Sequence, residues 1–202
     1  MSFYDRQEEF KLKKPKAICV VGCGGVGYWV AKFAAMSGIE KIYLFDPDTV
    51  EEHNLNRLDF TLESLGRNKA DITREVINSI RPECTVYAFP FILQEHTYPN
   101  DSVWLIDCTD NIKSQMENQE TAKKKGSRYV KAGYNGESIT IANVVAEWGD
   151  APDGYTIVPS WVVPATIVAA LTIGKVMKYE QEETAKKISQ FYDEKIEKKR
   201  RR

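Results

Sequence analysis

Glycines follow an apolar, β-branched run near the N-terminus, and an acidic residue comes nineteen residues after the last of them. Residues 18 to 27 read Ile-Cys-Val-Val-Gly-Cys-Gly-Gly-Val-Gly, and Asp46 ends a second short apolar run. Glycines after a strand permit a tight turn, the next helix offers free N–H groups to phosphate, and an acid after the second strand can bind ribose hydroxyls. The pattern predicts a nucleotide-binding βαβ unit whose loop contains Gly22, Gly24, Gly25 and Gly27.

Short apolar strands alternate with helical patterns along the rest of the chain. This order predicts an α/β fold: a Rossmann-like, doubly wound, mostly parallel sheet with helices on both faces. The expected strands are 18–21, 41–45, 85–89, 103–107, 128–133 and 138–147, and the expected helices are 28–36, 68–80, 112–125 and 164–178. Because ligands bind at the carboxyl ends of parallel strands, we expect Asp46, Asp107, Asp110 and the glycine loop to converge at one edge.

The last residues differ in composition from the rest. Residues 179–202 are rich in charge, and apolar side chains recur there at helical spacing before a basic end. We therefore expect one domain at 1–178, followed by a charged amphipathic helical tail at 179–202, either solvated or docked on a partner.

Composition and charge limit the classes of partner and location. The chain has 202 residues with 28 basic and 29 acidic side chains, so no global field favours nucleic acid, and we expect no nucleic-acid partner. Residues 155–174 carry no charge, but Pro159 and Pro164 would break a spanning helix, so we expect no membrane association. The first residues do not read as a signal peptide, and we expect a cytoplasmic protein with reduced thiols.

Five motifs in order carry a resemblance to a known family. After the glycine loop with Asp46 come a polar run ending at Arg57, Gly66-Arg-Asn-Lys69, Arg81-Pro82, and Asp-Cys-Thr-Asp-Asn at 107–111. Together they resemble the ThiF/MoeB adenylyltransferases and the adenylation domains of ubiquitin-activating enzymes, over residues 1 to 178. Tyr4-Asp-Arg6-Gln7 also resembles the N-terminal Arg-Gln motif of that family.

The resemblance implies an ATP- and Mg²⁺-dependent reaction. A carboxylate at the C-terminus of a small ubiquitin-like or sulfur-carrier protein, or of a peptide, would attack the α-phosphate of ATP, and pyrophosphate would leave. The protein must position both anions and neutralise the charge that grows on the phosphates. Such a reaction needs a phosphate-binding loop, cations and an acid that holds Mg²⁺.

The same resemblance assigns roles to individual residues. It implies that Asp46 binds the ribose hydroxyls, that Arg57 and Lys69 face the phosphates, and that Asp110 is the Mg²⁺ ligand. Arg6 would arrive from the second protomer of a homodimer, where its permanent charge and forked donors suit phosphate oxygens. The remaining residues expected to bind the cofactor are Asp48, Asn54 and Asn111.

Each of these residues also has a purely structural interpretation. Asp46 could form the turn at Asp-Pro-Asp, and Asp110-Asn111 would serve as the N-cap of the helix that starts at Ile112. Arg57 and Lys69 taken alone would be solvated surface charges. The functional interpretation depends on the order and spacing of all the motifs together.

The chain departs from the family pattern in its cysteines. The four cysteines form no Cys-x-x-Cys pair for zinc, and Cys108 is the last of them. No later residue can form a thioester or persulfide, so we expect adenylation without thiol transfer by this chain, and packing roles for the thiols.

Two other functions fit parts of the sequence. A nicotinamide-dependent oxidoreductase would use the glycine loop and Asp46, but the chain has only His53 and His96 and no evident catalytic acid–base pair. A non-catalytic half of an activating heterodimer would keep the fold, but could lose the cations and acid that this sequence retains.

Overall fold

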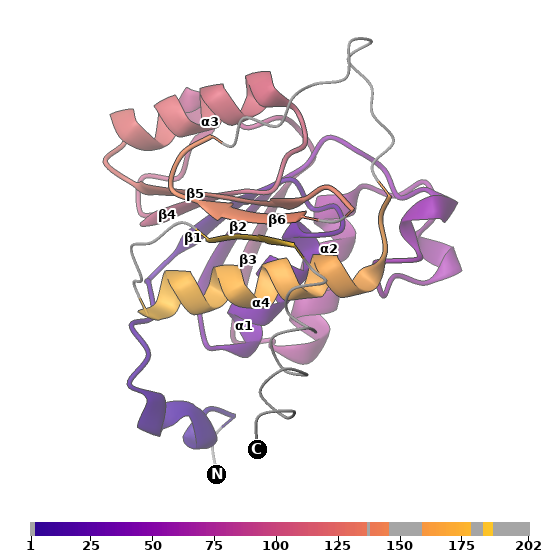
Figure 1. Cartoon of the computed structure of the whole chain (residues 1–202). Helices are drawn as coiled ribbons and strands as arrows, with labels where there is room; N and C mark the ends of the chain where they lie inside the picture. Colours follow the sequence, from indigo (N-terminus) through magenta and orange to yellow (C-terminus); the bar gives the residue numbers. More distant parts are fainter. Residues whose placement is uncertain (1–2, 137, 146–158, 179–183, 188–202) are drawn as a thin grey trace, which may run out of the picture.

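One twisted sheet forms the centre of the computed structural model, which describes residues 3–136, 138–145, 159–178 and 184–187. Within these residues the sheet has seven strands in the order β3-β2-β1-β4-β5-β6-β7 (Figure 1). β1 to β5 pair in parallel, whereas β6 and β7 pair antiparallel with their neighbours. The strands are β1 (Ile18–Val21), β2 (Lys41–Phe45), β3 (Thr85–Phe89), β4 (Trp104–Asp107), β5 (Arg128–Tyr134), β6 (Ser138–Ala142) and β7 (Thr184–Lys187).

Helices cover both faces of the sheet, as the sequence predicts. The described α-helices are α1 (Gly27–Met36), α2 (Lys69–Ile80), α3 (Ile112–Lys124) and α4 (Val162–Lys178). α1, α2 and α4 lie on one face, and α3 lies on the other (Figure 1). Short 3₁₀ helices occur at Asp5–Phe10, Glu52–Asn54, Leu62–Ser64 and Glu95–Thr97.

Burial on both sides explains the composition of the central strands. Every residue of β1 is buried, and its Ile-Cys-Val-Val sequence is typical of a parallel strand covered on both faces. One apolar cluster lies between the sheet and the helices α1, α2 and α4, and a second lies beneath α3. A third cluster, which includes Tyr28, Leu58 and Phe60, packs the segment after β2 against α1 and α2.

The sheet contains the switch point that such folds use for ligands. From β1 the chain builds β2 and β3 on one side, and then returns to build β4 and β5 on the other. The loops after β1 and β4 therefore leave neighbouring strands in opposite directions, and Val21 pairs with Asp107 at their carboxyl ends. The glycine loop and the Asp107–Asn111 loop thus meet at the switch point.

Two expectations differ from the structure at the C-terminal end. Residues 184–187 of the predicted helical tail form β7, which pairs with β6; this part of the helix prediction is wrong. A strand there satisfies backbone groups of β6 that would otherwise form an open edge. The strand predicted at 138–147 is too long, because β6 ends at Ala142 and residues 143–145 are not strand. Residues 146 and 147 lie outside the described residues, as does the rest of the tail. Within the part of the chain that the structure describes, no helix has both the length and the apolar character needed to cross a bilayer.

Candidate nucleotide-binding site

The glycine loop turns sharply between β1 and α1. Gly22 has a φ of +85°, and its N–H donates to the carbonyl oxygen of Phe45 over 2.8 Å. A Cβ atom at Gly27 would lie 1.7 Å from the carbonyl oxygen of Gly22, so only glycine fits the first position of α1. The Cys108 N–H donates to the Val21 carbonyl over 2.8 Å, which joins this loop to the one after β4.

Asp46 connects the glycine loop to the turn that follows β2. Its side chain is buried, and its two carboxylate oxygens accept hydrogen bonds from the backbone N–H groups of Cys23 at 2.5 Å and Asp48 at 2.8 Å. Burial raises the pKa of the Asp46 carboxyl above its usual value, while these two bonds and the charge of Lys69 oppose the shift. The carboxylate therefore shapes the loop in addition to its predicted contact with ribose.

Lys69 extends from the first turn of α2 toward the same region. Its ammonium lies 3.0 Å from a carboxylate oxygen of Asp48; the Lys69 side chain is 12% exposed and that of Asp48 is 64% exposed. Asn68 caps α2 by accepting from the N–H groups of Ala70 and Asp71. Its amide nitrogen also donates to the carbonyl oxygens of Asp46 and Asp48, so Asn68 holds the helix that presents Lys69.

Arg57 lies over the glycine loop. A Cβ atom at Gly25 would be 2.9 Å from Cδ of Arg57 and 3.3 Å from the hydroxyl of Tyr134, so these three residues meet at one point. The guanidinium donates to the carbonyl oxygen of His53 at 2.9 Å and to the side chain of Asn56 at 3.0 Å. The indole N–H of Trp29 donates to the Arg57 carbonyl at 2.8 Å, which fixes the backbone of this arginine against α1.

The side chain of Asn54 takes part in a local turn before Arg57. It is 3% exposed, and its side-chain oxygen accepts from the N–H of Glu51 in a capping box around the Glu52–Asn54 helix. The structure therefore gives Asn54 a role in shaping the segment before Arg57. Its predicted contact on the phosphate side stays a prediction.

Asp110 and Asn111 have different positions after β4. Asn111 is the N-cap of α3, with its side-chain oxygen accepting from the Ser114 N–H at 3.0 Å. Asp110 is exposed, and its carboxylate makes no hydrogen bond or ion pair with the other described residues. The described residues contain no group of three His, Cys, Asp or Glu side chains that could hold a metal. A single free carboxylate fits Mg²⁺, which proteins commonly hold by one or two carboxylates together with phosphates and water.

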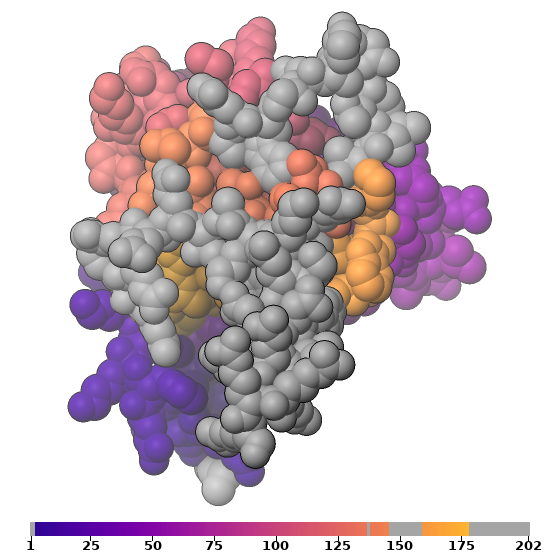
Figure 2. Space-filling view, viewed as in Figure 1, coloured from indigo at the N-terminus to yellow at the C-terminus, as the bar shows by residue number. Residues whose placement is uncertain are grey.

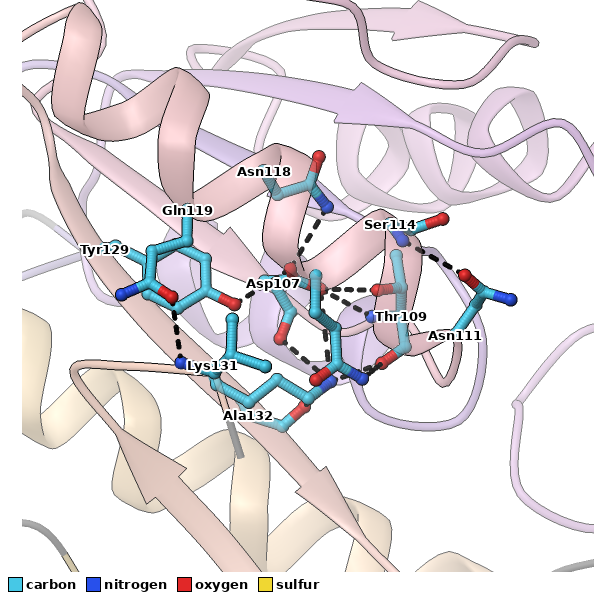
Figure 3. A network of polar contacts seen from close by, with 11 residues as sticks. Asp107, Thr109, Asn111, Ser114, Asn118, Gln119, Tyr129, Lys131 and Ala132 are labelled. Carbon is cyan, nitrogen blue, oxygen red and sulfur yellow. Dashed lines mark hydrogen bonds and ion pairs between the residues drawn. The ribbon is translucent and has the colours of Figure 1, made fainter. Parts of the chain in front are cut away.

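Asp107 lies next to this loop but is fully buried, so it faces the interior and not the open edge that we expected. One carboxylate oxygen accepts from the N–H and hydroxyl of Thr109 at 2.9 and 2.7 Å. The other accepts from Asn118 at 3.1 Å and from the Tyr129 hydroxyl at 3.0 Å (Figure 3). Burial and the nearby Asp107 charge raise the pKa of Tyr129, which therefore remains a donor.

Arg6 is far from these residues in its own chain. It is exposed on the Asp5–Phe10 helix, which contacts the C-terminal end of α1: Tyr4 donates to the Ala35 carbonyl at 3.3 Å, and Gln7 donates to the Ser37 carbonyl at 2.9 Å. The glycine loop lies at the opposite end of α1, about 15 Å away. In the space-filling view, this N-terminal segment (indigo) and α3 (pink) lie at opposite ends of the visible face (Figure 2).

The thiols have structural positions. All four cysteines are free; Cys19, Cys23 and Cys84 are buried, and Cys108 is half-buried. Burial raises the pKa of the Cys108 thiol to about 12, against a lowering by the nearby Lys131 charge. A thiol in this state is a poor nucleophile at neutral pH, in agreement with the packing role expected from the sequence.

A glycine-rich loop at the switch point of a doubly wound sheet, with an acid after β2 and cations beside the loop, defines a Rossmann-like nucleotide-binding domain. Comparison with known families then identifies the family within this class. The model of the ThiF family matches residues 2–195, and the chain belongs to that family.

Relatives and solved structures agree with this assignment. The chain is 35% identical over 111 residues to "tRNA threonylcarbamoyladenosine dehydratase" of Bacillus subtilis. The matched region covers 52% of this chain and 44% of the relative. It is 29% identical over 150 residues to "Ubiquitin-like modifier-activating enzyme 5" of Drosophila ananassae, covering 66% of this chain and 37% of the relative. This chain thus spans less than half the length of these curated relatives.

The solved structure of Escherichia coli MccB with ATP superposes with a TM-score of 0.71 at 18% identity, covering 87% of this chain and 64% of MccB. MccB with MccA-N7isoASN gives a TM-score of 0.75 at 18% identity, with 93% and 72% covered. At this identity the likeness establishes a shared fold.

The structure brings together most of the predicted site residues. The glycines, Asp46, Asp48, Lys69 and Arg57 are linked by the contacts above, and the Asp110 loop leaves the strand beside them. Arg6 is not part of this group within one chain. Sequence reasoning missed Asn68, Trp29 and Lys131; for Lys131 the available signal was a lysine inside the otherwise apolar run of β5.

Proposed function

We propose that this chain is an ATP- and Mg²⁺-dependent adenylyltransferase. It would activate the C-terminal carboxylate of a small ubiquitin-like or sulfur-carrier protein, or of a peptide, as an acyl-adenylate. The supporting observation is the arrangement at one sheet edge of a phosphate-type glycine loop, two cations and an uncommitted acid. Membership of the ThiF family adds support from an independent source.

The chain's residues divide the work of the proposed reaction. An oxygen of the substrate carboxylate forms a bond to the α-phosphorus of ATP, and the bond from that phosphorus to the bridging oxygen breaks, so that pyrophosphate leaves. The glycine loop offers backbone N–H groups, Asp46 orients the ribose, and Arg57 and Lys69 compensate the phosphate charge. Asp110 would hold Mg²⁺, which screens the phosphates when bound.

The relatives support more than one kind of acceptor carboxylate. The Drosophila relative is named for activating a ubiquitin-like modifier, and MccB has been solved with the MccA molecule. The Bacillus relative is named for a tRNA nucleoside. We favour a protein or peptide carboxylate, because this chain carries a formal net charge of -1 and has no basic excess to bind RNA.

Calorimetric titration with ATP and with NAD, each with and without Mg²⁺, tests the nucleotide. We expect ATP to bind more tightly than NAD, and Mg²⁺ to strengthen ATP binding alone, because Arg57 and Lys69 are placed for a triphosphate. Arg57→Met should weaken ATP binding, whereas Arg67→Met should not, since the Arg67 side chain is half-exposed and pairs with Glu75 on the surface. Tighter binding of NAD would contradict the proposal in favour of an oxidoreductase.

Exchange of labelled pyrophosphate into ATP then tests the substrate. Candidate small proteins are compared with the same proteins after removal or amidation of the C-terminal carboxylate, and with total tRNA. Exchange that depends on the free protein carboxylate supports the proposal. Exchange driven by tRNA alone would replace the proposed substrate class.

A homodimer is part of the proposal, because Arg6 lies far from the site of its own chain. We expect Arg6→Ala and Lys69→Ala each to be inactive alone, and their mixture to regain activity. In a mixed dimer, one site combines an intact Lys69 with an intact Arg6 from the other chain. Random exchange should restore about a quarter of parental activity, since about half of the dimers are mixed and each has one whole site.

As a control, each variant is taken alone through the same mixing procedure, and it should stay inactive. Mass spectrometry of differently labelled chains checks that subunits exchange. Exchange without recovery would place Arg6 outside the partner's site and remove this argument for a dimer.

A further inference from the structure

A buried lysine lies beneath the N-terminus of α3, where none of the proposed steps uses it. Lys131 is 3% exposed, in a strand whose neighbouring residues Val130 and Ala132 are fully buried and apolar. Its ammonium donates to the carbonyl oxygen of Thr109 and, at 3.4 Å, to that of Asp107. It also lies 3.9 Å from a carboxylate oxygen of Asp107, its buried counter-charge.

The carbonyl that Lys131 contacts belongs to the residue directly before Asp110. Thr109 is held at each of its polar groups: Asp107 accepts from its N–H and hydroxyl, and Gln115 donates to its carbonyl at 3.1 Å beside Lys131. On the other side of Asp110, Asn111 is fixed as the N-cap of α3. Thr109 and Asn111, the two residues that flank Asp110, are thus both held by hydrogen bonds (Figure 3). The uncommitted Asp110 carboxylate therefore extends from a short segment whose two ends are fixed.

We propose that Lys131 is a positioning residue, which holds the Thr109 backbone so that the Asp110 carboxylate is presented at the switch point. This inference rests on the proposed function, because it assigns Lys131 to the metal side of the same site. Groups that orient a metal ligand through a second contact commonly change metal affinity when removed, although they do not touch the metal. Lys131 acts through the backbone of the residue preceding the ligand.

The surroundings of Lys131 favour this role over direct contact with phosphate. Its side chain is 4% exposed, and its ammonium contacts carbonyl oxygens and the Asp107 carboxylate, all within the loop or strand beside it. An ammonium committed to these acceptors in the interior cannot reach a nucleotide without losing them. The Asp107 carboxylate, in turn, keeps four other hydrogen-bond donors when Lys131 is removed, so the loop should loosen and not unfold.

The test compares ATP binding with and without Mg²⁺ in the parent chain, in Lys131→Met and in Lys123→Met. Methionine keeps the unbranched apolar stem of lysine as far as Cε but lacks the ammonium donor. We expect the Mg²⁺-dependent gain in ATP affinity to fall about ten- to a hundredfold in Lys131→Met, with ATP binding in the absence of Mg²⁺ unchanged. Lys123 is an exposed lysine near the end of α3, and its variant should match the parent.

Two further variants separate positioning from general stability. Lys131→Met in an Asp110→Asn background should cause no additional loss of the Mg²⁺ gain, because both changes act through one carboxylate. Gln115→Met removes the other donor to the Thr109 carbonyl and should reduce the gain in the same direction. If Lys131→Met does not fold, Gln115→Met serves as the test of whether holding the Thr109 carbonyl matters for the Mg²⁺ gain. Gln115→Met should fold, because the buried side-chain oxygen of Gln115 has no hydrogen-bond partner in the described structure.

The outcomes distinguish the inference from the function on which it rests. A parent chain that binds ATP equally with and without Mg²⁺ would overturn the proposed function, and this inference with it. A parent gain that persists unchanged in folded Lys131→Met, or in Gln115→Met if the first variant is unfolded, would overturn the inference alone. Additive losses in the Asp110→Asn background would also overturn it.

Discussion

Replacing Asp110 with asparagine is expected to slow ATP–pyrophosphate exchange by about a hundredfold or more while the fold remains intact. The carboxylate is exposed and makes no hydrogen bond or ion pair within the described residues, so the protein itself does not depend on it. Its proposed work is to hold Mg²⁺ against the phosphates, and the amide of asparagine supplies no charge for that. Exchange assays and thermal unfolding of the purified variant measure the two effects separately.

Glu117→Gln provides the matched control for this variant. Glu117 is an exposed carboxylate on α3, and its removal changes the net charge by the same amount without touching the loop. It should retain parental exchange and stability. If the Asp110→Asn variant had the unfolding temperature of the parent and catalysed ATP–pyrophosphate exchange at the parental rate, the metal role of Asp110 would be wrong.

Gly27→Ala is expected to lower the free energy of unfolding by about 3 kcal/mol and to abolish ATP binding. In most helices, alanine in place of glycine stabilises by about 0.5–1 kcal/mol, so the expected sign is reversed here. The reason is steric: the new Cβ would lie 1.7 Å from the Gly22 carbonyl oxygen and 2.9 Å from its carbon. Both are backbone atoms, and no side-chain rotation can relieve the overlap.

The neighbouring Gly24 gives the control within the same loop. A Cβ there meets nothing within 4 Å, so Gly24→Ala should keep the unfolding free energy within about 0.5 kcal/mol of the parent. Chemical denaturation compares the two variants, and calorimetry with ATP follows binding. Equal stability of the two variants would mean that the loop does not have the turn described above.

The sequence predicted the elements that local chemistry controls. Val20 and Val21 end a strand because β-branched residues suit a sheet buried on both faces, and the glycines that follow permit the turn. The helix expected at 68–80 is observed as α2, which begins one residue later at Lys69. The convergence of the glycine loop with Asp46 follows from the parallel order, since carboxyl ends share one edge.

Contacts between residues that are far apart in the sequence could not be predicted from local sequence patterns. A lysine such as Lys131 is usually solvated, and its burial depends on acceptors from a loop more than twenty residues earlier. The position of Arg57 over Gly25 depends on how the segment after β2 packs on α1. β7 is a strand because β6 offers it an edge, and this cannot be read from the four residues themselves.

The bridging position of Asp46 has a consequence for the energetics of ligand binding. Because its carboxylate already accepts from Cys23 and Asp48, the glycine loop is held in one shape before any nucleotide arrives. A flexible loop would lose conformational entropy on binding, and this loss would weaken the observed affinity. Here that entropy is lost during folding. The hydrogen bonds of Asp46 therefore affect two free energies. They contribute to the free energy of unfolding, and they make nucleotide binding tighter because the loop is already ordered.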